Sequence, residues 1–247
     1  MPLLKRYLPV SKHKKYLLFL LITSIWAISP NFVGEELHYS AGFRLFPAGN
    51  AILSLKSDSL NGKLTYLLST SVKTNSFLDN FYEVRDEITA WLNPESLSLL
   101  KTIQNIREGS YHRDHEAIIR GDSLALWDEQ SRELPGQVYE PTAFVYYLRS
   151  QNLQLGDSYQ FYSYSRKKIR EVVVHITGSE TVKVAAGTFS CLKVEPVSND
   201  GKPLLKNNGE MRVWLSDDNL KLPVKIEMKT NIGNLIMKLK DYNYSTN

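Results

Sequence analysis

Apolar and polar positions alternate along many short segments of this chain. In residues 210–216 the side chains of Met211, Val213 and Leu215 fall on one face of an extended backbone, and the residues between them fall on the other. Residues 171–176 show the same period of two. One buried face and one wetter face is typical of an antiparallel β-sheet, so the pattern predicts strands.

Turn sequences rich in Gly, Pro, Asn and Asp separate these segments. Between them lie short runs of Val, Ile, Thr, Tyr and Phe, which predict about twelve consecutive antiparallel strands. The strands do not alternate with helical patterns, which excludes a doubly wound parallel sheet. The turn sequences are at residues 47–50, 61–62, 93–96, 108–110, 135–136, 156–157, 177–179, 186–188, 199–201, 216–219 and 232–234.

Two short segments have helical patterns. Residues 142–150 place their apolar side chains on one stripe, and Pro141 stands where a helix commonly begins. Residues 76–81 predict a single helical turn with Ser76 as its cap. The least patterned stretch, residues 128–141, predicts a long crossing loop that leads into the first of these helices.

The N-terminus has the pattern of an export signal. Residues 1–29 contain five Lys and Arg residues, no acidic residue and an uncharged run of 13 residues at 16–28. That run is shorter than the roughly 20 residues that a membrane-spanning helix needs. We therefore predict a signal peptide at 1–29 followed by a single β domain at 30–247. Pro30 would follow the cleavage point, so cleavage and retention as an anchor both remain open.

Charge and cysteine content narrow the class of protein. The formal net charge of +4 depends on the predicted signal peptide, because residues 30–247 carry 25 basic and 26 acidic residues, a formal charge of −1. A near-neutral surface lacks the basic patch of a nucleic-acid-binding protein. The single cysteine, Cys191, cannot form an intramolecular disulfide. We interpret it as a small buried hydrophobic residue.

The sequence Gly121-Asp122-Ser123-Leu124 matches the nucleophile block of a lipase and esterase family, and with Arg120 it matches an adhesive tetrapeptide. Nucleophilic catalysis needs a base and a group that orients the base, and neither follows in a matching arrangement. Gly and Asp between two strand-like segments are typical of a tight turn. We interpret the motif as a turn.

The densest cluster of titratable residues is at 111–116. On a strand, His112, Asp114 and Glu116 would share one face, which suggests metal ligands. Zinc sites generally use three protein ligands of fixed geometry, and the remaining histidines are distant in the sequence. We therefore interpret this face as a solvated strand surface without a metal.

A second polar set follows the neighbouring strands. If these strands pair in order, their Arg, Glu and Tyr side chains form a polar layer that binds an anionic or sugar ligand through planar Arg donors. Ordinary cross-strand charge pairing explains the same pattern equally simply. The candidate ligand-binding residues are Arg85, Glu87, Arg107, Tyr111 and Arg113.

The order of several motifs resembles the exported bacterial family of domain of unknown function 3108, over nearly all of residues 32–243. The resemblance implies a strongly curved antiparallel sheet or a partly open β-barrel, similar in style to lipoprotein carriers. It implies no settled activity and no catalytic residues. The motifs are Phe32-Val33-Gly34-Glu35-Glu36-Leu37-His38-Tyr39, Ala48-Gly49, Tyr82-Glu83-Val84-Arg85-Asp86, Tyr147-Leu148-Arg149, Leu155-Gly156-Asp157, Ala186-Gly187-Thr188-Phe189-Ser190-Cys191, Val213-Trp214-Leu215-Ser216-Asp217-Asp218 and Leu222-Pro223-Val224.

We therefore predict a mainly β protein with one or two short helices. It is expected to be periplasmic or associated with the outer envelope of a Gram-negative bacterium. The predicted function is non-catalytic binding or carriage of an apolar or glycan ligand, with the helix at 142–150 over one mouth of a groove.

The alternative is an envelope carbohydrate-active hydrolase or lyase, for which Glu87, Asp114 and Glu116 are the candidate carboxylates. The residues favour a binding protein over an enzyme. We expect no cofactor, no metal, no nucleic-acid partner and no stable membrane span after signal removal. The ligand is expected to be a lipid or a glycan, and the sequence does not determine which, nor the oligomeric state.

Overall fold

The computed structural model describes residues 32–43, 46–165, 167–200, 209–230 and 233–244. The predicted signal peptide lies outside these residues. The described chain contains two helices and fifteen strands. The strands are β1 (Glu35–Phe43), β2 (Phe46–Leu60), β3 (Lys63–Thr74), β4 (Arg85–Leu92), β5 (Leu99–Glu108), β6 (Tyr111–Arg120), β7 (Leu124–Trp127), β8 (Gln130–Glu133), β9 (Val138–Tyr139), β10 (Ser158–Ser165), β11 (Lys168–Val184), β12 (Gly187–Ser198), β13 (Glu210–Ser216), β14 (Pro223–Thr230) and β15 (Gly233–Tyr244).

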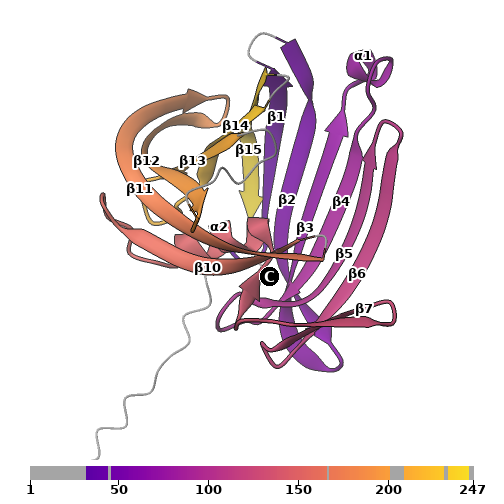
Figure 1. The fold of residues 1–247 in the computed structure, drawn as a ribbon. Coiled ribbons are helices and arrows are strands. Elements are labelled where there is room, and N and C mark those ends of the chain that lie inside the picture. Colours follow the sequence, from indigo (N-terminus) through magenta and orange to yellow (C-terminus); the bar gives the residue numbers. More distant parts are fainter. Residues whose placement is uncertain (1–31, 44–45, 166, 201–208, 231–232, 245–247) are drawn as a thin grey trace, which may run out of the picture.

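All fifteen strands belong to one sheet, in the order β8-β7-β6-β5-β4-β3-β2-β1-β15-β14-β13-β12-β11-β10-β9. The first and last strands pair in the middle, and on each side of them neighbours in the sheet are neighbours in the chain. The sheet is therefore two strongly curved meanders joined at β1 and β15, and it stays open at β8 and β9 (Figure 1). The prediction of a curved, mainly β fold is confirmed.

The predicted number of strands, about twelve, is wrong. The predicted crossing loop at 128–141 contains two strands of its own, β8 with four residues and β9 with two. Both are too short to show an alternating pattern, and every residue of β8 is exposed. The β9 strand also pairs with β10 in parallel, in a sheet expected to be antiparallel.

The two helices are close to their predicted positions. The helix α2 spans Pro141–Arg149, and the buried side chain of Glu140 caps it by accepting hydrogen bonds from the backbone N–H groups of Thr142 and Ala143. The helix α1 spans Ser76–Asp79. Its cap is the neighbouring Asn75, which corrects the prediction of Ser76, because only the Asn75 side chain accepts a hydrogen bond from Leu78 N.

The motif at 121–124 is a turn, as predicted. Gly121 and Asp122 have φ values of 57° and 56° and connect β6 to β7. A left-handed backbone of this kind favours Gly and tolerates Asp, which explains the sequence without any catalytic role.

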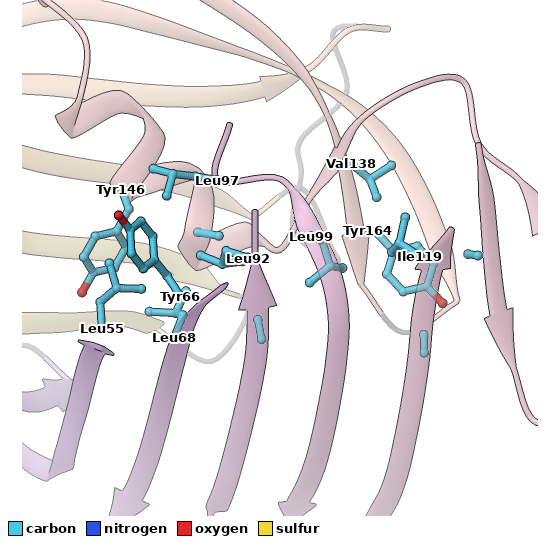
Figure 2. Close-up of a cluster of buried hydrophobic side chains, with 14 of the residues drawn as sticks. Leu55, Tyr66, Leu68, Leu92, Leu97, Leu99, Ile119, Val138, Tyr146 and Tyr164 are labelled. Atoms are coloured by element: carbon cyan, nitrogen blue, oxygen red, sulfur yellow. The ribbon is translucent and has the colours of Figure 1, made fainter. Parts of the chain in front are cut away.

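The helix α2 lies between the two meanders and packs against both. Its Tyr146 joins a buried cluster with Leu68 and Leu92 of the first meander, which Tyr164 of β10 also covers (Figure 2). Its opposite face, with Phe144, belongs to a second cluster with the inner side chains of β10 to β14. One end of the first meander is therefore filled and closed, and we call this end the base.

Candidate functional site

Strand pairing divides the predicted layer of Arg85, Glu87, Arg107, Tyr111 and Arg113 between the two faces of the sheet. Arg107 pairs with residue 112 of β6, so its side chain points away from those of Tyr111 and Arg113 on either side of that residue. The first three residues lie on the outer face, and the last two lie on the inner face, which also carries the buried clusters. The structure does not bring the five residues together.

The outer-face residues of that set already have charged partners. The Arg85 guanidinium contacts Asp79 at 2.7 Å, Arg107 contacts Asp114 at 2.7 Å, and Glu87 lies 3.8 Å from Lys73. Ion pairs that are open to solvent contribute little to stability or affinity. Arg107 and Glu87 therefore pair with charges across neighbouring strands, and Arg85 pairs with the end of α1, as the second interpretation of the sequence expects.

The three carboxylates considered for glycoside hydrolysis lie on this same outer face. Glu116 pairs with Lys101 at 2.7 Å, and Asp114 and Glu87 have the basic partners described above. All three side chains are more than half exposed. They form a solvated strand surface, as predicted for residues 112, 114 and 116.

The inner face of β3 to β6 carries a more unusual set of polar side chains. Cross-strand pairing aligns Thr70, Ile88, Gln104 and His115 in one row. Thr102 lies in the next row toward the base. Gln104, Thr102 and His115 are at most 5% exposed. We call Thr70, Thr102, Gln104 and His115 the inner polar belt.

Three members of the inner polar belt lack hydrogen-bond partners among the described residues. They are the hydroxyls of Thr70 and Thr102 and the amide nitrogen of Gln104. A buried donor without a partner costs roughly 1–3 kcal/mol. Such groups are rare in native proteins, and each requires an explanation such as an ordered water or a ligand.

His115, the fourth member, connects the belt to the second meander. Its Nε2 lies 3.2 Å from the hydroxyl of Tyr164 on β10. Burial, assisted by the positive charges of Arg113 and Lys167, lowers the pKa of His115. Burial also raises the pKa of Tyr164 to about 12. Both groups are therefore neutral near pH 7, and the belt presents neutral donors and acceptors.

The inner face changes character along the strands. On the base side of the belt, Leu68 and Ala90 belong to the packed apolar cluster. On the other side lie the half-buried Val72, then Asp86 and Arg113 in the row beyond the belt. In that row Val72 pairs with Asp86 and the buried Ile106 pairs with Arg113, so the surface passes from apolar through neutral polar to a row of mixed apolar and charged side chains.

A buried ion pair at the base was missed by the sequence reasoning. The Arg149 guanidinium at the end of α2 contacts both carboxylate oxygens of Glu35 on β1, and both side chains are at most 1% exposed. Arg149 also donates to the carbonyl of Leu220 at 3.0 Å. Burial, followed by the Glu35 charge, raises the pKa of Tyr146. Glu35 and Arg149 both lie in motifs of the family resemblance, which was the available signal, but nothing in the sequence shows that they meet.

The described ranges contain neither a cluster of metal ligands nor a helix that could span a membrane. No group of three or more His, Cys, Asp or Glu side chains there is arranged to hold a metal ion. None of the helices described is both long enough and apolar enough to cross a bilayer.

Solved structures with a similar fold have low sequence identity to this chain. A β-barrel-like protein of domain of unknown function DUF1849 from Brucella abortus superposes with a TM-score of 0.63 at 11% identity, over 87% of this chain and 99% of the other. A candidate lipoprotein from Parabacteroides distasonis and a candidate exported protein with a YmcC-like fold from Bacteroides fragilis give TM-scores of 0.37 and 0.32 at 13% and 14% identity. Each covers 87% of this chain and 97% of the other. The first of these likenesses supports the barrel-like fold.

The search of curated proteins finds no match to this sequence. The family model for DUF3108, described as a protein of unknown function, matches residues 36–240. This match covers most of the chain and agrees with the order of motifs noted in the sequence. The chain therefore belongs to the DUF3108 family.

Proposed function

We propose that this protein is an exported, non-catalytic binding protein that holds an amphipathic lipid on the inner face of β3 to β6. The observation that carries the proposal is the inner polar belt, in which polar atoms of Gln104, Thr102 and Thr70 have no hydrogen-bond partner among the residues described. A ligand with a hydrogen-bonding group would supply those partners. Its apolar part would lie along Val72 and Ile88, which are half-buried on the same face.

The neutrality of the belt favours an uncharged polar group such as a hydroxyl, an ester or an amide. Gln104 offers amide hydrogens, and Thr70 and Thr102 each both donate and accept. Small-molecule sites typically combine an apolar surface with a few well-placed polar groups of this kind. Arg113 and Asp86, in the row beyond the belt, place one positive and one negative charge next to this surface.

The proposed location outside the cytoplasm depends on the N-terminal sequence. The basic residues and the short apolar run at 1–29 have the pattern of a signal peptide. An exported protein that binds an amphipathic molecule would serve envelope maintenance or lipid carriage. Binding, rather than turnover, is proposed because the candidate carboxylates Glu87, Asp114 and Glu116 are solvated side chains on the outer face.

The proposal is tested by identifying what the protein carries. The full chain is expressed in a Gram-negative host, purified from the envelope fraction without detergent and examined by native mass spectrometry with lipid analysis of the released material. We expect a lipid of defined mass on the wild type. Replacing Gln104 by Leu removes the unpartnered amide and is expected to reduce the bound fraction about tenfold, the effect of losing one hydrogen bond of roughly 1.4 kcal/mol.

The matched control is Glu87→Gln on the outer face, which should carry the same amount of lipid as the wild type. Wild-type protein that repeatedly carries no lipid would refute the proposal, because ordered water would then explain the belt. Equal loading of the wild type and the Gln104→Leu variant would show that the lipid binds elsewhere.

A further inference from the structure

Large aromatic side chains are exposed at the end of the first meander opposite the base, where β2, β4 and β6 begin (Figure 1). Phe46 at the start of β2 is 71% exposed, and Phe77 and Phe81 at α1 are 64% and 75% exposed. Tyr82 and Tyr111 are about half exposed. We call Phe46, Phe77, Phe81, Tyr82 and Tyr111 the aromatic rim.

Contacts link the segments that carry the aromatic rim. The rings of Phe77 and Phe81 lie 5.6 Å apart. Tyr82 packs over Gly109 in the turn that leads to β6, where an added Cβ would meet its ring at 2.8 Å. On the other side, the Asn75 amide donates to the carbonyl of Pro47, beside Phe46, at 2.8 Å.

The structure holds the rim in an exposed position. The Arg85 guanidinium donates to both carboxylate oxygens of Asp79, the last residue of α1, at 3.1 and 2.7 Å. It also lies 3.3 Å from Glu83. These contacts fix α1 against β4, with one guanidinium shared by two carboxylates, and the exposed rings of Phe77 and Phe81 lie on and beside α1.

A small cavity of about 220 Å³ continues this surface on the other side of Phe46. Its walls include Pro47, Ile236, Gly42 and Lys238. Lys238 is exposed and lies across from Lys225 of β14 in the sheet. The hollow has polar and apolar walls in similar measure, and the Lys238 ammonium group at its edge fits one lipid phosphate.

We propose that this end of the molecule docks on the surface of an anionic lipid bilayer. Exposed aromatic rings on the turns at one end of a sheet match the interfacial region, where aromatic side chains are favoured. Lys238 complements a lipid phosphate. The inner polar belt lies on the inner face of the same meander, between this end and the base.

The inference does not depend on the proposed lipid load, because vesicle binding and bound lipid are measured separately. The full chain is expressed with its signal sequence, and the protein released from the membrane is purified. It is then sedimented with vesicles of phosphatidylethanolamine and phosphatidylglycerol. The test variant is the double replacement Phe77→Ser with Phe81→Ser. The matched control is Leu64→Ser, because Leu64 is 61% exposed but lies at the opposite end of β3.

We expect the double variant to bind vesicles at least about tenfold more weakly than the wild type, and the Leu64→Ser variant to bind normally. Lys238→Gln should weaken binding to vesicles that contain phosphatidylglycerol and leave binding to phosphatidylcholine vesicles unchanged. Circular dichroism verifies that each variant is folded. The proposal is overturned if the folded wild-type protein does not sediment with vesicles. It is also overturned if Leu64→Ser loses as much binding as the double variant.

Discussion

Two arginine–carboxylate pairs lie at opposite ends of the first meander, and each anchors a helix to a strand. Arg149 joins α2 to Glu35 of β1 at the base, where both side chains are at most 1% exposed. Arg85 of β4 joins Asp79 of α1 at the open end, where the two side chains are 35% and 26% exposed. Both pairs join a guanidinium to a carboxylate, and they differ in their exposure to solvent.

Because of this difference in exposure, we expect the buried pair to stabilise the fold and the exposed pair to position the surface around α1. The buried pair has no water to replace a lost partner, so each member depends on the other. The exposed pair exchanges its partner for water at little cost, so it orders α1 without contributing much to the fold. We therefore expect replacements at the base to unfold the protein and replacements at the open end to change what the surface binds.

The largest effect is expected from Arg149→Ala. The Glu35 charge would stay buried without its partner, and the carbonyl of Leu220 would lose a donor, so the free energy of unfolding should fall by about 3–5 kcal/mol. Urea unfolding followed by tryptophan fluorescence measures the loss. As a control, the joint replacement of Glu35 and Arg149 by Met removes both charges and should recover most of the stability. A single-variant loss below about 1 kcal/mol would show that the pair does not hold the base together.

An intermediate effect is expected at Glu140, the buried cap of α2. Burial raises its pKa from 4.5 to about 7. A raised pKa means that the folded protein binds the proton more tightly, so this contribution to stability is complete below about pH 4.5 and lost as the pH rises through 7. The shift corresponds to a free energy on the order of 3 kcal/mol.

Glu140→Gln keeps an oxygen that can accept the same backbone hydrogen bonds but cannot ionise. We expect the variant to match the wild type near pH 4 and to be more stable above pH 8. The difference between the two urea-unfolding profiles, measured from pH 4 to pH 9, isolates this one group. Parallel profiles across that range would contradict a raised pKa at Glu140.

The smallest effect on stability is expected from Arg85→Ala. The midpoint of urea unfolding should stay nearly unchanged, while the backbone amides of α1 should exchange hydrogen faster because the helix loses its anchor. The Arg85 hydrogen bond lowers the pKa of Asp79. The same loosening should therefore appear in the wild type when the pH falls through that lowered pKa. Lys73→Ala is the control, and a large loss of stability in Arg85→Ala would show that the open end is not independent of the base.

Much of the fold could be predicted because the alternation of apolar and polar residues along an antiparallel strand reflects which side chains are buried. The alternation at 171–176 predicted the buried Val172, Val174 and Ile176 of β11, and the helix predicted at 142–150 is α2 shifted by one residue. The strands β8 and β9 were not predicted, because a strand of two to four residues is too short to show an alternating pattern. The predicted polar layer is divided between the two faces of the sheet. The sequence does not fix the pairing of the strands, and a shift of one residue in pairing moves a side chain to the opposite face.

Local residue patterns were sufficient to predict the class of fold, the family and many of the turns, because these depend on residues that lie close together along the chain. The turns predicted at 47–50 and 177–179 are wrong: these residues lie inside β2 and β11, next to register shifts that the glycines allow. The tertiary structure was needed to show that Glu35 meets Arg149, and that Gln104, Thr102 and Thr70 share one face with no hydrogen-bond partner in the part of the chain that the structure describes. The same holds for the aromatic rim, whose side chains come from three separate turns. Such juxtapositions depend on strand register and on the curvature of the whole sheet, and no local pattern of residues encodes either one.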